Sequence, residues 1–170
     1  METNIKINYL WPDKTNDMIA IQDFYEDEFS VCFGCGRLNK DGHQLKTFLI
    51  GNETISEHIP DKNKTAIEGI VYGGLLASLI DCHGTGSASA FYAKKNGIKL
   101  KQYNAPRFVT GNLNVSYLKP TPLNKKLTLK GTLKEIKERK VVVSIAVFCE
   151  DTLTVKGEVV ALLLPENFKV

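Results

Sequence analysis

The sequence predicts an α+β domain in which one long helix packs against an antiparallel sheet of five or six strands. The first observation is the segment Gly73–Lys95, the longest helical pattern in the chain, which is rich in small and apolar residues. The second is a C-terminal half made almost wholly of alternating apolar and polar residues with short turns. A chain that keeps its helix apart from its run of strands is typical of the α+β class.

Six segments alternate in the manner of strands. Two precede the helix, at residues 44–50 and 54–59, and Gly51 and Asn52 join them as a hairpin. Four follow the helix, at residues 107–119, 126–136, 139–150 and 153–164. The turns near Glu138 and Asp151 are short, so we expect the strands that flank each of them to pair antiparallel.

The N-terminal region is predicted to be an extension of this domain, over residues 1–30. Residues 1–15 are mixed in character, whereas residues 16–29 have the spacing of an amphipathic helix that Asn16 or Asp17 would cap. The acidic residues of this segment are expected on a solvated surface. We therefore treat residues 1–170 as a single domain.

Composition excludes several classes of protein. The chain has 170 residues, of which 43% are hydrophobic and 24% charged, as in ordinary globular domains. The net charge of +3 is too small to indicate nucleic-acid binding. No apolar run approaches the roughly 20 residues of a membrane span, and the N-terminus lacks a signal-peptide pattern. We expect a cytoplasmic protein with no nucleic-acid or membrane partner.

The cysteines Cys32, Cys35, Cys82 and Cys149 are expected to be reduced thiols in such a protein. Cys32 and Cys35 have the C-x-x-C spacing of a zinc or redox pair. The polar run that follows them favours a structural loop, with metal binding and redox chemistry as alternatives. Cys82, Cys149 and the histidines are not spaced as further ligands, so no metal site is predicted.

The long helix carries a stripe of small residues, namely Gly73, Ala77, Gly84 and Ala88. Gly84 and Gly86 each cost about 1 kcal/mol in a helix interior relative to alanine, so a packing reason is expected. The simplest is a sheet that wraps closely around the helix. The alternative is a helix broken at Gly84-Thr85-Gly86.

The start of this helix has the features of a catalytic site. Gly73 and Gly74 would leave unpaired N–H groups at the positive end of the helix dipole, where an oxyanion can be stabilised. Asp81 is a carboxylate on a face of small residues, which is unfavourable unless it has a partner or a function. Together they indicate hydrolysis or acyl transfer at a carbonyl. The alternatives are a tight turn for the glycines and a structural pairing for Asp81.

The distance between these features has a consequence for assembly. Asp81 follows the glycine pair by seven or eight residues, which is roughly 10–12 Å along a helix. One chain therefore cannot bring both to the same carbonyl. Two chains with antiparallel helices across a two-fold axis would do so, which predicts an obligate dimer with shared sites.

Three segments resemble the hotdog-fold thioesterases, specifically the PaaI-like acyl-CoA thioesterases. They are V-Y-G-G-L-L-A-S-L-I-D-C-H-G-T-G (residues 71–86), C-F-G-C-G-R-L-N-K-D-G-H-Q-L (residues 32–45) and T-G-N-L-N-V-S-Y-L-K-P-T-P-L (residues 110–123). The resemblance spans residues 32–164. It implies a hotdog fold, with the sheet wrapped around one central helix, and a homodimer or dimer of dimers with sites at the interface.

The resemblance also implies an activity, the hydrolysis of acyl-CoA to a free acid and coenzyme A without a further cofactor. Asp81 would be the general base or nucleophile, the Gly74 N–H the oxyanion donor, and Thr110 the residue that positions the water or the carboxylate. Tyr72, Gly73, Asn112, Asn114 and Lys119 are expected to contact the substrate.

One departure from the family motif affects the expected activity. Tyr72 stands where the family usually has histidine before the glycine pair. The alternative is therefore a weak or silent hotdog protein that binds acyl-CoA without turnover. His83 lies roughly 200° around the helix from Asp81, so we expect it to be a buried structural histidine rather than a second catalytic group.

Overall fold

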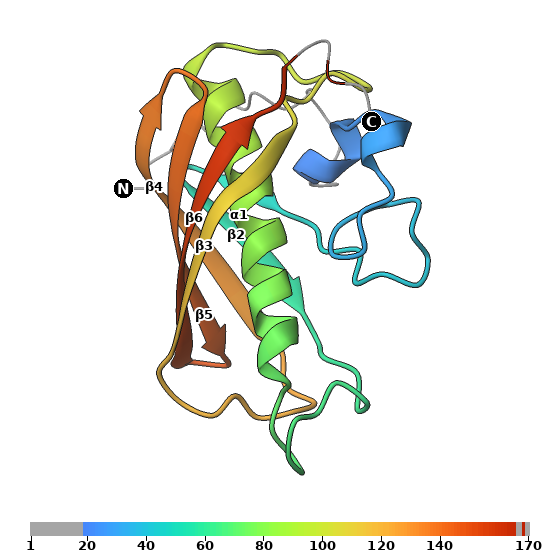
Figure 1. The fold of residues 1–170 in the computed structure, drawn as a ribbon, viewed down its shortest axis with the longest axis vertical. Coiled ribbons are helices and arrows are strands. Elements are labelled where there is room, and N and C mark those ends of the chain that lie inside the picture. The colour runs from blue at the N-terminus through green and yellow to red at the C-terminus, as the bar shows by residue number, and fades with distance from the viewer. Residues whose placement is uncertain (1–18, 166–167, 169–170) are drawn as a thin grey trace, which may run out of the picture.

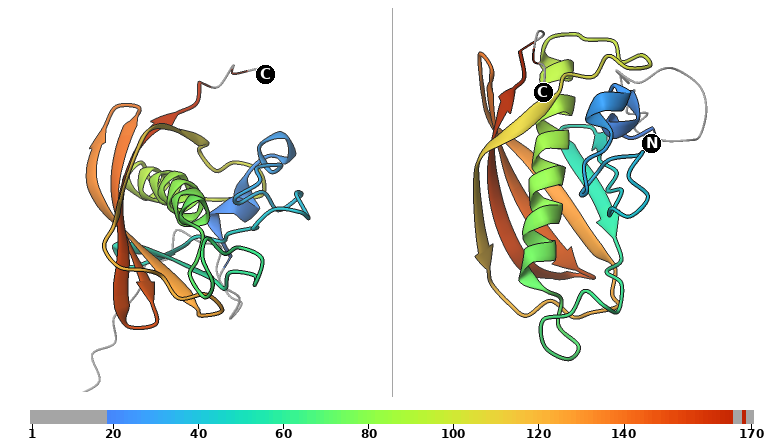
Figure 2. Two further views of the ribbon diagram at one scale, coloured as in Figure 1. Left: turned by 60° about the horizontal axis from the view of Figure 1, so that its bottom comes forward. Right: turned by 45° about the vertical axis from the view of Figure 1, so that its right-hand side comes forward.

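The computed structural model describes residues 19–165 and 168, and shows one antiparallel sheet curved around a single long helix (Figure 1). The helix α1 comprises Gly73–Lys95. The sheet has the order β1-β2-β4-β5-β6-β3, and the left view of Figure 2, which looks roughly along the helix, shows how the sheet curves around it. Its strands are β1 (Phe48–Ile50), β2 (Glu53–His58), β3 (Phe108–Tyr117), β4 (Leu127–Lys137), β5 (Lys140–Cys149) and β6 (Thr152–Leu163).

The strand order follows from short turns and one long return. β1 and β2 form a hairpin, as do β4 with β5 and β5 with β6, and every pairing is antiparallel. Gly51, Glu138 and Glu150 have positive φ angles at the three turns. β3 pairs only with β6 and lies at one edge of the sheet. The predicted α+β class, the helix bounds and the antiparallel pairing are confirmed.

The helix is unbroken through its glycines, which confirms the packing explanation and excludes the break at Gly84-Thr85-Gly86. Gly84 lies directly under β6, because a Cβ atom at this position would be 2.4 Å from Cγ2 of Val159. The core between helix and sheet contains Leu79, Ile80 and Val143, all fully buried. No helix in the described part of the chain is long and apolar enough to span a membrane.

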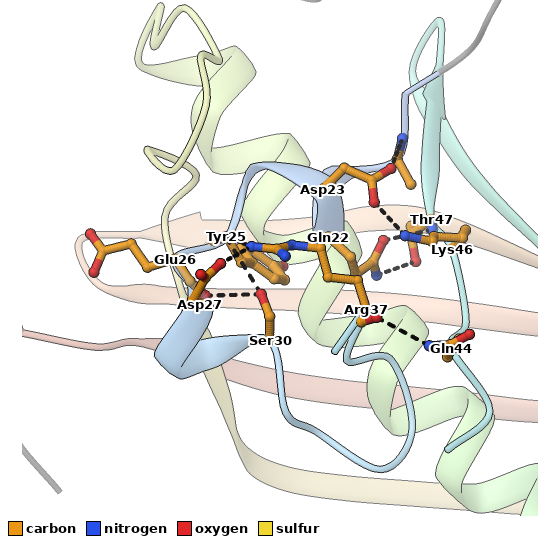
Figure 3. Close-up of polar contacts among 11 residues, drawn as sticks. Gln22, Asp23, Tyr25, Glu26, Asp27, Ser30, Arg37, Gln44, Lys46 and Thr47 are labelled. Carbon is orange, nitrogen blue, oxygen red and sulfur yellow. Dashed lines mark hydrogen bonds and ion pairs between the residues drawn. The ribbon is translucent and has the colours of Figure 1, made fainter. Parts of the chain in front are cut away.

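The predicted amphipathic helix over residues 16–29 is wrong for the part that the structure describes; residues 16–18 lie outside it. Residues 19–29 instead form two 3₁₀ turns, η1 (Ile21–Phe24) and η2 (Asp27–Phe29). The physical reason is pairing with the segment before β1. The Ile21 N–H donates to the Thr47 carbonyl at 2.9 Å, and the Gln22 side chain bonds to the Thr47 backbone and hydroxyl (Figure 3).

This N-terminal segment covers the C-terminal half of α1 on a side that the sheet leaves open (Figure 2). Ile21, Phe24 and Tyr25 are buried against Ala90 and Ala93 of the helix. Asp23 pairs with Lys46, and Asp27 pairs with Arg37, so part of the acidic run is engaged in ion pairs (Figure 3). Residues 19–29 are therefore packed against the helix and the loop before β1, whereas residues 1–18 lie outside the described part of the chain.

Candidate functional site

Asp81 and Thr110 meet between α1 and the edge strand. The Thr110 hydroxyl donates a hydrogen bond to Oδ1 of Asp81. Both side chains are partly buried, and Oδ2 of Asp81 has no hydrogen-bond partner among the described residues. The pair therefore presents a carboxylate with one oxygen fixed and the other available. The structure brings these two predicted residues together; their catalytic role stays a prediction.

The first turn of α1 has two free donors. The N–H groups of Leu75 and Leu76 bond to the Tyr72 carbonyl, at 3.1 and 3.5 Å. The N–H groups of Gly73 and Gly74 have no acceptor in the part of the chain that the structure describes. Free donors at the start of a 23-residue helix are suited to an anionic oxygen.

A partly exposed stripe connects this helix start to Asp81. Three residues follow Gly74 at helical spacing, namely Ala77, Ser78 and Asp81, which lie three, four and seven positions later. The four residues therefore share one face of α1, and all are only partly buried. Seven residues of unbroken helix place Gly74 and Asp81 about 10 Å apart along the axis. Within one chain the free donors and the carboxylate are therefore two separate half-sites.

A β-bulge at Gly111 separates Asn112 and Asn114 from Thr110. The register of β3 with β6 shifts between Thr110 and Asn112. Thr110 lies opposite Ala161, whereas Asn112 and Asn114 lie opposite Val160 and Glu158. Since directly paired residues share a face, the two asparagines lie on the outer face of the sheet. Strict alternation along the predicted strand 107–119 would put all three residues on one face, and the bulge shows that this is wrong. The substrate contacts predicted for Asn112 and Asn114 therefore lack support from the geometry of one chain.

A pocket of about 460 Å³ opens at the start of α1. Its walls come from the loop before the helix, the first helical turn and the end of β3 with the segment that follows. The lining is mostly apolar and includes Ile70, Leu76, Tyr117, Leu118 and Lys119. This volume is in the usual range for small-molecule sites. The pocket brings the predicted residues Gly73 and Lys119 together at one opening.

Two tyrosines flank the glycine pair. The Tyr117 hydroxyl donates to the Gly73 carbonyl at 2.8 Å, which fixes the first helical residue to the end of β3. Tyr72 is 53% exposed, and its ring lies over Gly74, because a Cβ atom on Gly74 would be 2.1 Å from the Tyr72 hydroxyl. The sequence indicated Tyr117 only as part of a motif; its contact with the helix start could not be inferred from spacing.

His83 lies on the opposite side of α1 from this site, in a buried polar network. Its Nδ1 is 2.7 Å from the Ser56 hydroxyl, and Nε2 is 3.4 Å from that of Thr54. The network continues to Thr47, Gln22 and Ser87. Burial lowers the pKa of His83 to about 3, so the ring is neutral. The prediction of a buried structural histidine is confirmed.

Three of the four thiols gather beside α1. Cys82 lies against the loop that carries Cys32 and Cys35, so the expectation that Cys82 could not join the C-x-x-C pair is wrong. Hydrogen bonds from the Cys35 and Cys82 thiols lower the pKa of Cys32. Hydrogen bonding with Cys32 raises the pKa of Cys35 to about 11. The predicted loop structure of this segment is confirmed, and the fourth thiol, Cys149, is buried.

Comparison with known proteins shows the family to which this chain belongs. The model of the Thioesterase superfamily matches residues 68–156. A crystal structure of a Thioesterase superfamily protein from Shewanella loihica PV-4 is 43% identical and covers 83% of this chain and 100% of that one, with a TM-score of 0.63. Among curated proteins, no sequence matches this chain.

More distant structures share the fold. The PaaI protein from the phenylacetic acid degradation operon of E. coli has 10% identity and a TM-score of 0.59, covering 72% of this chain and 81% of that one. Cj0977, a sigma28-regulated virulence protein from Campylobacter jejuni, has 13% identity and a TM-score of 0.60, covering 88% and 99%.

The sheet wrapped around one helix is the hotdog fold. This chain belongs to the Thioesterase superfamily, and that membership suggests hydrolysis of a thioester. The resemblance found in the sequence motifs is thereby confirmed at the level of fold and family.

Proposed function

We propose that this protein is an acyl-CoA thioesterase, which hydrolyses its substrate to a free acid and coenzyme A. The observation that carries the proposal is the Asp81 carboxylate, held on one oxygen by Thr110 and open on the other, on the partly exposed face of α1. A carboxylate of this kind can remove a proton from water or attack the thioester carbonyl directly.

The proposed site contains residues from two chains. The free N–H of Gly74 would donate to the thioester oxygen as negative charge develops there, while Asp81 of the partner subunit would act on the same carbonyl. The separation of about 10 Å along one helix supports this division, since antiparallel helices across a two-fold axis exchange the two ends. Homodimers are the smallest assembly with complete sites, and a dimer of dimers would also contain them.

The pocket at the helix start supports a long, mostly apolar substrate with a charged end. Its apolar walls suit an acyl or pantetheine chain, and Lys119 at its edge would meet a phosphate of coenzyme A. Gly73 and Tyr72 would form the rim next to the reacting carbonyl. The pocket, which lies at the Gly74 end of α1, would then receive the catalytic carboxylate from the second chain.

The proposal is tested with a panel of acyl-CoA esters and a thiol-release assay. We expect hydrolysis of at least one ester, and a fall in kcat of about 10²–10⁴-fold in Asp81→Asn and Asp81→Ala, the size typical of a lost general base. Asp151→Asn, which removes an exposed carboxylate from the turn before β6, is the matched control and should retain full turnover. Normal turnover by Asp81→Ala would exclude the assigned role.

Binding without turnover is the second candidate function, and Tyr72 is the observation that favours it. The Tyr72 ring lies over Gly74, the residue whose N–H the first proposal needs. Calorimetric binding of acyl-CoA, with no thiol release across the panel, would favour this function. Tyr72→His separates the two, because restored turnover in this variant would show that the tyrosine alone silences an otherwise complete site.

A further inference from the structure

Three sulfur atoms lie together between α1 and the loop that precedes β1. Cys32 and Cys35 come from this loop and Cys82 from the helix, and the three Sγ atoms all lie within 4.8 Å of one another. The sulfurs of Cys32 and Cys82 are 3.8 Å apart. Cys35 and Cys82 are buried, whereas Cys32 is partly exposed, so the group has one side toward solvent.

The loop approaches the helix this closely because of Gly34. A Cβ atom on Gly34 would be 2.2 Å from the Cys82 sulfur, so no larger residue fits there without movement of the thiol. The Leu45 N–H donates to the Gly34 carbonyl at 3.0 Å, and the His43 N–H donates to the Phe33 carbonyl at 2.8 Å. These bonds close the loop on itself with both of its thiols toward Cys82.

Polar contacts outside the thiol group hold the loop in place (Figure 3). Arg37 donates to the Tyr25 carbonyl at 3.3 Å and pairs with Asp27. The Gln44 amide donates to the Arg37 carbonyl at 3.1 Å. The positions of the sulfurs are therefore fixed by the rest of the fold, without need of a bond between them.

The distance between the sulfurs of Cys32 and Cys82 is the one that a shared metal ion requires. Two thiolates on a tetrahedral zinc ion, each about 2.3 Å from the metal, are about 3.8 Å apart. This is the distance between Cys32 and Cys82. A disulfide requires about 2.05 Å, would use only two of the three sulfurs, and would leave the third without a role.

Arg107 is a half-buried cation close to the thiols of Cys32 and Cys35. Arg107 lies over the Tyr25 ring at 4.7 Å, and its Nη1 has no hydrogen-bond partner among the described residues. Burial lowers the pKa of Arg107, but Tyr25, Cys35 and Cys32 raise it by more, so the guanidinium stays charged. A zinc ion bound to three thiolates has a net charge of −1, for which a nearby half-buried guanidinium is a favourable neighbour.

We propose that Cys32, Cys35 and Cys82 form a binding site for a thiophilic metal ion, with zinc as its natural occupant. Binding releases three thiol protons to solvent and leaves the fourth zinc position, on the exposed side next to Cys32, for water or an external ligand. The ion would fasten the loop to α1 at the residue directly after Asp81. This metal site does not depend on the proposed hydrolysis, because the metal would touch neither Asp81 nor the pocket.

Metal content and cobalt binding test this site. Protein purified without chelators should contain about one zinc ion per chain by elemental analysis. Metal-free reduced protein titrated with Co²⁺ under nitrogen should develop thiolate-to-cobalt charge-transfer bands and the strong visible bands of tetrahedral cobalt. Cys32→Ser and Cys82→Ser should lose both signals, whereas Cys149→Ser, which removes a buried thiol outside the group, should keep them.

The variants distinguish metal binding from loss of fold. Cys32 is partly exposed in a loop, so Cys32→Ser should keep the wild-type circular dichroism spectrum even if Cys82→Ser in the helix does not. Zinc-free protein with four titratable thiols and no cobalt–thiolate bands would overturn the proposal. A Cys32–Cys35 disulfide in metal-free protein that binds no cobalt after reduction would also overturn it, in favour of a redox pair.

Discussion

The contribution of Thr110 to turnover can be measured without changing Asp81. Its hydroxyl fixes one oxygen of the carboxylate, and a hydrogen bond to a charged group contributes about 1.5–3 kcal/mol. We therefore predict that Thr110→Val lowers kcat by about 10–100-fold in the acyl-CoA assay. Thr110→Ser, which keeps the hydroxyl, should stay close to wild type. A Thr110→Val protein with wild-type kcat would show that the contact is structural only.

At the scale of single residues, the sequence is sufficient to name candidate side chains but not to predict where they point, and the catalytic roles of the candidates stay predictions. Gly74, Asp81 and Thr110 were identified because their types and order match a known motif. Strict alternation along the strand would place Asn112 and Asn114 on the face of Thr110, but the bulge at Gly111 puts them on the other face. A bulge depends on the pairing of β3 with β6, two strands far apart in sequence, so a local pattern could not reveal it.

His83 predicts how stability depends on pH. Its pKa is lowered to about 3 by burial, whereas in the unfolded chain it is about 6.5. Below pH 6.5 the unfolded state therefore binds a proton that the folded state does not. The free energy of unfolding should fall as the pH falls from about 6.5 to about 3, by up to about 1.4 kcal/mol per pH unit from this group.

The measurement is urea denaturation across this pH range for wild type and His83→Asn. Other titrating groups, including His43 and His58, are present in both proteins, so the difference between the two profiles isolates His83. We expect the variant to be less stable at pH 7 but to lose less stability on acidification. Parallel profiles would show that His83 takes up a proton in the folded state.

At the scale of elements, the small-residue stripe of α1 predicts a test of close packing. Gly84→Ala improves helix propensity by about 1 kcal/mol but places a Cβ atom 2.4 Å from Val159. Overpacking of this kind costs about 1–3 kcal/mol, so we predict net destabilisation in urea denaturation. Val159→Ala in the same chain should recover part of the loss. Additive effects of the two substitutions would contradict the contact.

The sequence predicts well those elements whose start and end depend on residues close to them in the chain. The helix begins at a glycine pair and ends before Asn96-Gly97, and the strands after it are separated by short turns. The helix prediction for the N-terminal segment was wrong because its apolar spacing suits a helix, whereas its backbone and Gln22 bond to Thr47, some 25 residues later. Cys82 was missed for the same reason, since only the fold brings it beside the C-x-x-C loop.

At the scale of the whole molecule, the proposed site would be incomplete in one chain, and an exposed edge of the sheet lies beside it. β3 is an edge strand, and its residues Val109, Leu113 and Tyr117 are large apolar side chains left exposed. Leu113 and Tyr117 lie on the face of β3 that meets α1, next to the partly exposed helix residues Gly74 and Asp81, whereas Val109 lies on the outer face. An exposed edge beside an apolar surface favours association, and a two-fold axis there would complete two sites at once.

Subunit complementation tests this assembly directly. Asp81→Ala lacks the carboxylate, and Gly74→Val displaces Tyr72 and disturbs the oxyanion donor, so each homodimer should be nearly inactive. A mixed dimer has one site with an intact glycine from the first chain and an intact aspartate from the second. Random pairing of equal amounts makes half of the dimers mixed, so co-expression should restore about one quarter of wild-type activity per dimer. Activity no higher than that of the separate variants would place Gly74 and Asp81 in one chain's own site, or assign one of them no catalytic role.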